Sequence, residues 1–426
     1  MLVAALVVLL LCLLVMAGMP VLVSLAASVA IYLLVSGGWG LSLPQQVISG
    51  MNDFVLLALP LFILAGGIMN AGGITKRLVE FAVALVGFMR GGLAHVNVAT
   101  SIMFGGMIGT SVADLAGTGS VLIPSMKEQR YPGTFAAALS ASSSGIGPLI
   151  PPSSPMILYS VVTGTSLGAL FLAGLIPGLL LGVSQMCIVA WLARRHGWTS
   201  MGRLSLREIL RTGARAVLAF GLPVIILGGL VFGIFTPTEA GAFAVVYALL
   251  LAGPVYRRLD WRGLYRVAAN SATLTGEVML IVGLSTALGW ALSNAKIPQG
   301  LAEVIDTLVF FDSVILRIFV LLLLAILAGM ILDPLIPVIM PIILPTLLIF
   351  DIDLLHFGVL MVIAVVIGQV TPPIAIALVV ASAIANEDLA RVIRANTPFL
   401  IGLAAFLILV VLFPSLATWL PRALGQ

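Results

Sequence analysis

The segment Gly147-Pro148-Leu149-Ile150-Pro151-Pro152 recurs in the second half of the chain as Gly368-Gln369-Val370-Thr371-Pro372-Pro373. Both copies follow a Gly-x-x-x-Pro-Pro pattern inside strongly apolar surroundings. Proline removes a backbone donor and clashes with the preceding helical turn, so each apolar helix is predicted to open here. Opened backbone inside a membrane must meet a ligand, an ion or water. Two interrupted helices at matching positions of two halves are a strong sequence indication of a transporter binding site.

The composition places the chain in a membrane. Of its 426 residues, 61% are hydrophobic and only 8% are charged, and the mean hydropathy is +1.24. A soluble globular surface cannot be built from this composition. The net charge of +4 comes from basic residues scattered through short loops, which indicates membrane orientation and lipid contact, with no nucleic acid as a partner. The start, Met1 to Ala17, lacks a basic leader region and is expected to be a retained first span.

Segment length separates ordinary spans from unusual ones, because a crossing helix needs about 20 apolar residues. The segments 95–126 and 315–349 are too long for one crossing and carry Gly, Pro and polar residues at their centres. We predict that both are helical hairpins that enter the membrane and return. The segments 134–160 and 355–385 contain the two Pro-Pro pairs and are predicted to be broken helices.

Further matches support an internal repeat. Gly106-Met107-Ile108 corresponds to Gly329-Met330-Ile331, and Pro124 corresponds to Pro345 at nearly the same offset. We therefore divide the chain into a first repeat, 1–205, and a second repeat, 206–426. Each repeat is expected to hold scaffold helices, one hairpin and one broken helix.

Charge placement predicts how the two repeats are oriented. The loop between the repeats is rich in arginine and is expected to be cytoplasmic. If neither the short segment 78–89 nor the first hairpin crosses, the first repeat crosses an odd number of times, so the N-terminus is predicted to be periplasmic and the second repeat is inverted. Inverted repeats give one midplane site two access states. The sequence therefore predicts an all-α polytopic membrane protein with inverted-topology repeats.

Several motifs together resemble one known family, the large membrane (M, DctM-like) subunit of tripartite ATP-independent periplasmic (TRAP) transporters. The resemblance covers essentially the whole chain. It rests on Leu57 to Phe62, Arg90 to Ala94, Gly109 to Asp114, Gly147 to Ser153, Phe235 to Ala240 and Ile367 to Pro373.

The resemblance implies a sodium-coupled importer of an organic acid, either a carboxylate or a sugar acid, in the bacterial inner membrane. It also implies an elevator-type fold similar to the ion transporter superfamily, in which hairpins and broken helices move against a scaffold. A small membrane subunit of four helices and a periplasmic substrate-binding protein are the expected partners. Sodium is the expected coupling ion, and no organic cofactor is expected. A stand-alone ion-coupled dicarboxylate or arsenite-type permease is the alternative, since it would share the hairpins and inverted halves.

The residues also predict where sodium binds. Sodium is a hard cation that takes several oxygens, and a bilayer offers them only from broken-helix carbonyls, hydroxyls and carboxylates. Asp333 is the foremost candidate because a carboxylate in apolar surroundings is costly to ionise without a cation; its structural alternative is a hairpin N-cap facing solvent. The predicted sodium ligands are Ser111, Asp114, Gly145, Gly147, Asp333, Gln369, Val370 and Thr371.

An anionic substrate is predicted to lie between these groups, because helices restarting after each Pro-Pro pair direct positive dipole ends inward. Serines in membrane helices also serve helix packing, and this alternative stays open for each of them. The predicted substrate-binding residues are Thr110, Ser142, Ser144, Pro151, Pro152, Ser153, Pro372 and Pro373.

The sequence disfavours two other functional interpretations, a proton-carrying role for Glu239 and an intramembrane enzyme. Glu239 is a possible proton carrier, but Thr236-Pro237-Thr238-Glu239 fits a helix N-cap better. An intramembrane enzyme would need a nucleophile with its base or paired aspartates. Asp114 and Asp333 are the plausible pair, and their equivalent positions in two hairpins explain them without catalysis. We therefore expect no enzymatic activity.

Overall fold

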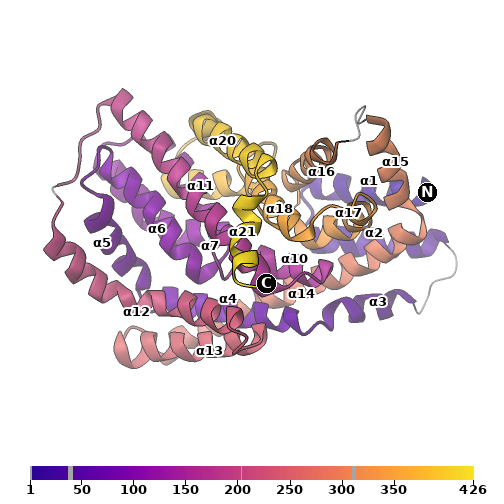
Figure 1. Cartoon of the computed structure of the whole chain (residues 1–426), viewed down its shortest axis with the longest axis horizontal. Helices are drawn as coiled ribbons and strands as arrows, with labels where there is room; N and C mark the ends of the chain where they lie inside the picture. The colour runs from indigo at the N-terminus through magenta and orange to yellow at the C-terminus, as the bar shows by residue number, and fades with distance from the viewer. Residues whose placement is uncertain (1, 37–41, 203, 309–312, 333) are drawn as a thin grey trace.

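A computed structural model of the chain describes residues 2–36, 42–202, 204–308, 313–332 and 334–426. Every regular element in these ranges is a helix (Figure 1). The first half contains α1 Leu2–Met16, α2 Val21–Ser36, α3 Ser42–Met51, α4 Ala58–Ala71, α5 Ile74–Val86, α6 Gly92–Ile108, α7 Ser111–Asp114, α8 Ser120–Glu128, α9 Gly133–Ser144, α10 Ser154–Thr163 and α11 Leu167–His196.

The second half continues in the same way. It contains α12 Leu206–Val231, α13 Pro237–Leu250, α14 Trp261–Asn294, α15 Ile297–Leu308, α16 Val314–Gly329, α17 Ile336–Ile349, α18 Leu354–Gln369, α19 Ile376–Ala385, α20 Leu389–Leu412 and α21 Ser415–Ala423. Two π-helical turns, Leu115–Gly119 and Leu251–Val255, follow α7 and α13.

Polar side chains define where several of the long helices begin. Thr236 and Glu239 form a capping box at the start of α13, since each side chain bonds the other residue's backbone N–H. Asp260 accepts from Gly263 N at 2.9 Å and caps α14, and Asp353 caps α18 in the same way. The prediction that Glu239 serves as a helix cap is confirmed.

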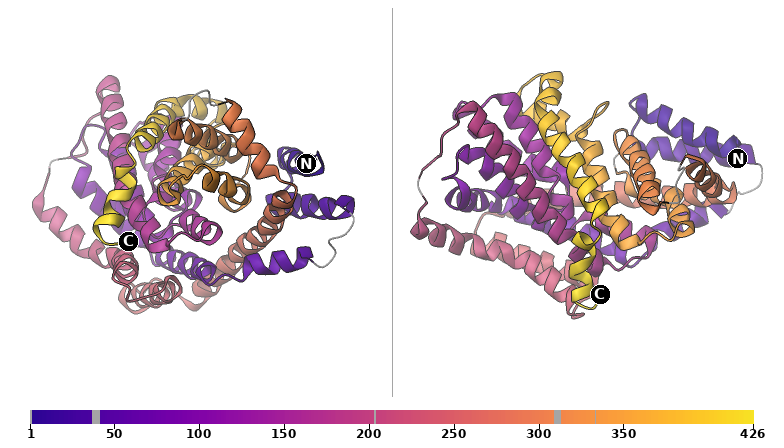
Figure 2. Two further views of the ribbon diagram at one scale, coloured as in Figure 1. Left: turned by 45° about the vertical axis from the view of Figure 1, so that its right-hand side comes forward. Right: turned by 45° about the horizontal axis from the view of Figure 1, so that its top comes forward.

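The long helices form an outer edge beside a buried centre. In Figure 1, α12, α13, α14 and α3 run along the lower side of the molecule, and α18 lies in the middle. Helix α14 packs against α2, α3, α4 and α17. The turned views in Figure 2 show the same division. Helix α18 is apolar on all sides and is buried from His356 to Gln369.

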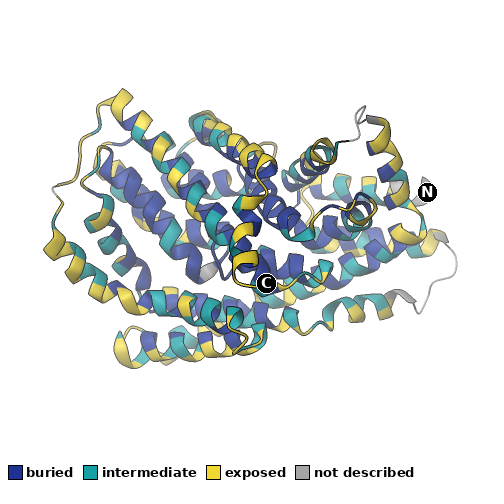
Figure 3. Cartoon of the chain, viewed as in Figure 1, coloured by how far each residue is buried: buried dark blue, intermediate teal, exposed yellow. Residues whose placement is uncertain are grey.

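The outward faces of α12 and α13 are apolar and exposed (Figure 3), as expected where a helix faces lipid. Val217 and Val224 on α12, and Phe243 on α13, are each at least half exposed. In the part of the chain that the structure describes, five helices are long and apolar enough to cross a membrane: α11, α12, α13 with its π-helical turn, α14 and α20. A sixth span results if α3 and the helix ending at Ala71, which meet at 62°, count as one. The predicted all-helical, polytopic class is confirmed.

Both helices carrying the Pro-Pro pairs are interrupted, as the sequence predicts. Helix α9 ends at Ser144 and α10 starts at Ser154, while α18 ends at Gln369 and α19 starts at Ile376. The peptide bonds Pro151-Pro152 and Pro372-Pro373 are both cis.

Within the segments predicted to be hairpins, α6 contacts α8 and α16 contacts α17. The half-helix that follows each break packs against elements of the other half of the chain. Helix α10, after the first break, packs on α17, and α19, after the second break, packs on α7 and α9. Re-entry of the hairpins into the membrane and the inverted relation of 1–205 to 206–426 stay predictions.

Candidate functional site

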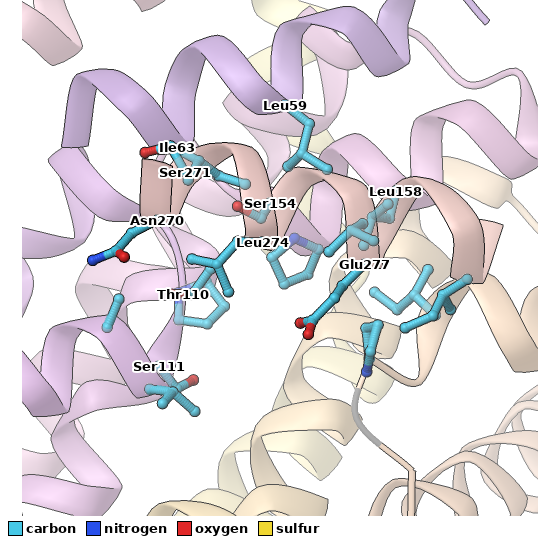
Figure 4. Close-up of a pocket in the computed structure, with 18 of the residues that line it drawn as sticks. Leu59, Ile63, Thr110, Ser111, Ser154, Leu158, Asn270, Ser271, Leu274 and Glu277 are labelled. Carbon is cyan, nitrogen blue, oxygen red and sulfur yellow. The ribbon is translucent and has the colours of Figure 1, made fainter. Parts of the chain in front are cut away.

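A cavity of about 860 Å³ opens between the helix breaks and the outer helices. One wall is formed by α4 and α14, and the other by the connections after α6 and α9, the start of α17 and the end of α18. Figure 4 shows α14 crossing the cavity, with Thr110 and Ser111 on the opposite side. The polar residues lining it are Asn70, Thr110, Ser111, Ser154, Asn270, Ser271, Glu277 and Gln369.

Gly109 fixes the tip of the first hairpin against the first helix break. It ends α6 with φ of +66°, in the left-handed region that side chains rarely adopt. Its neighbour in space is the carbonyl of Pro152, and an added Cβ would collide with that oxygen. Ser154 N donates to Gly109 O at 3.3 Å across the same contact. Thr110 then takes an extended conformation, so the chain turns into the cavity before α7 begins.

Asp114 and Ser111 form a buried polar pair behind this tip. Both are only 1% exposed, and they lie three residues apart, on one face of α7. Thr118 Oγ1 donates to Asp114 Oδ1 at 3.1 Å. The Ser101 side chain lies beside the same carboxylate, but Asp114 Oδ2 and Ser111 Oγ complete no hydrogen bond among the described residues.

A buried carboxylate oxygen without a donor is costly unless a cation meets it. The oxygen donors of Ser111 and Asp114 suit a hard cation such as sodium. The π-helical turn Leu115–Gly119 follows directly, and such turns are frequent at functional sites. No group of three or more His, Cys, Asp or Glu side chains gathers in the described ranges.

Serines at the first break mostly stabilise the break itself. Ser153 is fully buried, donates to Pro148 O and accepts from Met156 N, so it caps α10. Ser144 Oγ donates to Ala141 O at 2.8 Å within its own helix. Ser142 Oγ donates to Asn396 Oδ1 at 2.6 Å.

Asn396 of α20 links the two breaks. Its Oδ1 accepts from Ser142 of the first break, and its Nδ2 donates to Val370 O of the second at 3.2 Å. Gln185 of α11 adds a bond from Nε2 to Ser142 O at 2.8 Å. These side chains are at most 1% exposed, so the network holds both breaks together inside the protein.

Glycines allow each break to approach its hairpin closely. A Cβ on Gly105 would lie 2.8 Å from Gly147 Cα, and one on Gly368 would lie 2.7 Å from the backbone carbon of Gly329. A side chain at Gly105 or at Gly368 would force the backbones apart. The two copies differ in which glycine is indispensable: a Cβ on Gly147, the motif position equivalent to Gly368, would lie at an ordinary 3.6 Å from Gly105 Cα.

The structure brings only part of the predicted site to the cavity. Thr110, Ser111 and Gln369 line it, and Asp114 lies one helical turn behind Ser111. Thr371 Oγ1 donates to Ile367 O at 2.6 Å, and Pro372 and Pro373 are exposed. Asp333 lies outside the described residues. The other predicted ligands surround the two breaks without lining the cavity: Gly145, Gly147, Val370, Ser142, Ser144, Pro151, Pro152 and Ser153.

Five polar lining residues are absent from the sequence prediction. Asn270, Ser271 and Glu277 all come from α14, Asn70 comes from α4, and Ser154 begins α10. Glu277 could have been found, because an ionisable residue inside a predicted span, here 268–293, marks a functional candidate. The asparagines and the serines carry no comparable signal.

Comparisons with known proteins agree with this architecture. A family model described as tripartite ATP-independent periplasmic transporter, DctM component, matches residues 6–416. The chain is 38% identical over 409 residues to the sialic acid TRAP transporter large permease protein SiaM of Vibrio cholerae, covering 95% of each chain. It is also 38% identical over 387 residues to the C4-dicarboxylate TRAP transporter large permease protein DctM of Pseudomonas aeruginosa, covering 90% of each.

A solved structure shares the fold at low sequence identity. The Alcanivorax borkumensis YdaH transporter superposes with a TM-score of 0.57 at 13% identity, over 88% of each chain. The likeness shows a shared helical fold and carries no information on substrate.

Proposed function

Because the chain belongs to the DctM component family of tripartite ATP-independent periplasmic transporters, we propose that it imports an organic acid in symport with sodium. Relatives of this family are permease subunits of transporters, which supports a role other than catalysis. The multi-pass character of the chain follows from its apolar helices and its family, and the periplasmic N-terminus is part of the proposal.

The buried pair Ser111 and Asp114 carries the sodium proposal. Their side chains hold oxygens without a hydrogen-bond partner in the described structure, one turn from the cavity. A sodium ion would neutralise the carboxylate and would give the oxygens of both side chains a binding partner. Gly145, Gly147, Gln369, Val370, Thr371 and Asp333 remain the other proposed sodium ligands, through carbonyl, hydroxyl or carboxylate oxygens.

The substrate carboxylate is proposed to lie in the cavity against the hydroxyl groups of Thr110 and Ser154. Both line the cavity beside the first break. Relatives are named for sialic acid and for C4-dicarboxylates, which makes an organic acid the substrate class. Ser142, Ser144 and Ser153 would contribute indirectly, by holding the shape of the break.

Elevator movement is proposed from the packing of the helices. The half-helices cross over, α10 onto α17 and α19 onto α7 and α9, so hairpins and breaks form one interlocked body. The facing wall, α4 and α14, belongs to the outer helices (Figure 1). Sliding of this body past α14 would expose the cavity to each side in turn.

The proposed partners are a small four-helix membrane subunit and a periplasmic substrate-binding protein, with lipid around the outer helices. A reconstitution experiment tests this arrangement. The chain is placed in liposomes alone, or with a small four-helix subunit and a binding protein of the same transporter, and uptake of labelled succinate and sialic acid is followed with and without a sodium gradient.

We expect uptake only with all three components and sodium. Robust uptake by the lone chain would support the stand-alone permease and contradict the three-part proposal. Equal uptake with and without sodium would contradict the coupling ion.

A further inference from the structure

Glu277 stands in the wall of the cavity, in a position with no role in the proposal so far. It lies midway along α14, is exposed, and lines the cavity with Asn270 and Ser271 of the same helix. Asn270 and Glu277 are seven residues apart, which places them on one face two turns apart. Figure 4 shows the carboxylate of Glu277 directed away from α14 into the open space.

Among the residues that the structure describes, the charge of Glu277 has no opposite charge beside it. Among the described residues lining the cavity, Glu277 is the one ionisable side chain. It forms no ion pair within the described ranges. The nearest basic residue along its helix, Arg266, is eleven positions earlier, about 16 Å along the axis at 1.5 Å per residue.

A negatively charged side chain in the cavity wall disfavours a substrate that carries negative charge alone. Like charges that share one cavity repel, and the apolar neighbours Leu274 and Ile281 offer a substrate anion neither a compensating charge nor a hydrogen bond. The repulsion disappears if the substrate brings a positive charge of its own. A charged pair lined by apolar side chains is also a specificity element, because it excludes ligands that lack the matching group.

We propose that the cavity selects an organic acid that also carries a positively charged nitrogen, with Glu277 pairing with that nitrogen. The carboxylate end lies toward Thr110 and Ser154, and the cationic end toward α14. Asn270 and Ser271 supply further hydrogen bonds along the same face of α14. This inference rests on the proposed function and narrows its substrate class.

The test compares acids that differ only in the amine. Liposomes holding the chain with its small subunit are supplied with matched pairs: succinate and aspartate, glutarate and glutamate, propionate and alanine. Uptake is measured with the binding protein present over a range of substrate concentrations. Glu277→Gln removes the charge with almost no change of shape, and Glu277→Lys reverses it. Glu303→Gln, on the exposed face of α15, removes the same charge outside the cavity.

We expect the wild-type transporter to favour the amine-bearing member of at least one pair by about tenfold or more in kcat/KM. Glu277→Gln should lose that preference mainly through KM, Glu277→Lys should reverse it, and Glu303→Gln should keep it. Equal handling of both members by the wild type, or an equal loss for both in Glu277→Gln, overturns the inference. So does a Glu277→Gln variant that keeps the preference but loses dependence on a proton or sodium gradient.

The two proposals fail in different ways. Absence of sodium-driven uptake for every acid in the panel, sialic acid included, contradicts the proposed function. Sodium-driven uptake without discrimination by the amine contradicts only the role of Glu277.

Discussion

Ser142 Oγ and Asn396 Oδ1 are joined by a 2.6 Å hydrogen bond that ties the first helix break to α20. The same asparagine bonds Val370 O at the second break, so one buried side chain spans both. A residue outside the recurring motif therefore holds the two copies of that motif in register. The geometry of the transport site depends on this bridge as much as on the prolines.

Replacing Asn396 by Leu should destabilise the protein without touching the cavity. The change leaves the buried Val370 carbonyl and Ser142 hydroxyl without their partner, at about 1–3 kcal/mol for each unsatisfied group. Thermal unfolding of the purified variant in detergent should show a clearly lower midpoint. Asn270→Leu, an exposed asparagine, serves as the control, and equal midpoints for the two variants would contradict the bridge.

Gly368→Ala should disturb the second break by steric conflict. The new methyl group would lie 2.7 Å from the backbone carbon of Gly329, and relief requires α16 and α18 to separate. Overpacking of this kind costs about 1–3 kcal/mol. Gly228→Ala in α12, where an added Cβ meets nothing within 4 Å, is the matched control. Unfolding midpoints that are equal for the two alanine variants would exclude the close approach.

Thr236→Ala removes the capping box of α13. Loss of an N-cap side chain costs about 1 kcal/mol, because the N–H of Glu239 loses its acceptor. We expect a modest drop in the unfolding midpoint with sodium dependence of uptake unchanged. A variant with full stability but altered coupling would assign this end of α13 to transport.

Ser111→Ala should raise the sodium concentration needed for half-maximal uptake by roughly three- to tenfold, since it removes one oxygen worth on the order of 1 kcal/mol. Ser120→Ala provides the control, because Ser120 is exposed and its Oγ only bonds Gly117 O. Sodium activation curves of reconstituted transporter give the comparison. Coincident curves for wild type and Ser111→Ala would favour a packing role for Ser111.

The sequence predicts the helix breaks because proline acts locally: it removes a donor wherever it stands. The all-helical class and the cap at Thr236 follow from similarly local rules. The site depends on tertiary packing and is less predictable. Polar residues near the break were expected to face the substrate, yet Ser142 and Ser153 use their hydroxyls on the protein itself.

The opposite wall of the cavity shows the same limit. Asn270 and Glu277 reach the cavity because α14 packs beside α4 and α17, a relation that no local pattern in α14 encodes. Only the charge of Glu277 within an apolar chain gave a signal. Asn396 is equally hidden in the sequence, since its importance comes from spanning two breaks far from it in the chain.

The most direct test of sodium binding at the first break is uptake by Asp114→Asn as a function of sodium concentration, in liposomes holding all three components. The substitution keeps the size of the side chain and the hydrogen bond from Thr118, and it removes the negative charge of the buried carboxylate. Uptake that no longer responds to sodium, with the protein inserted in normal amount, is the predicted result. An activation curve that coincides with the wild-type curve would contradict the account.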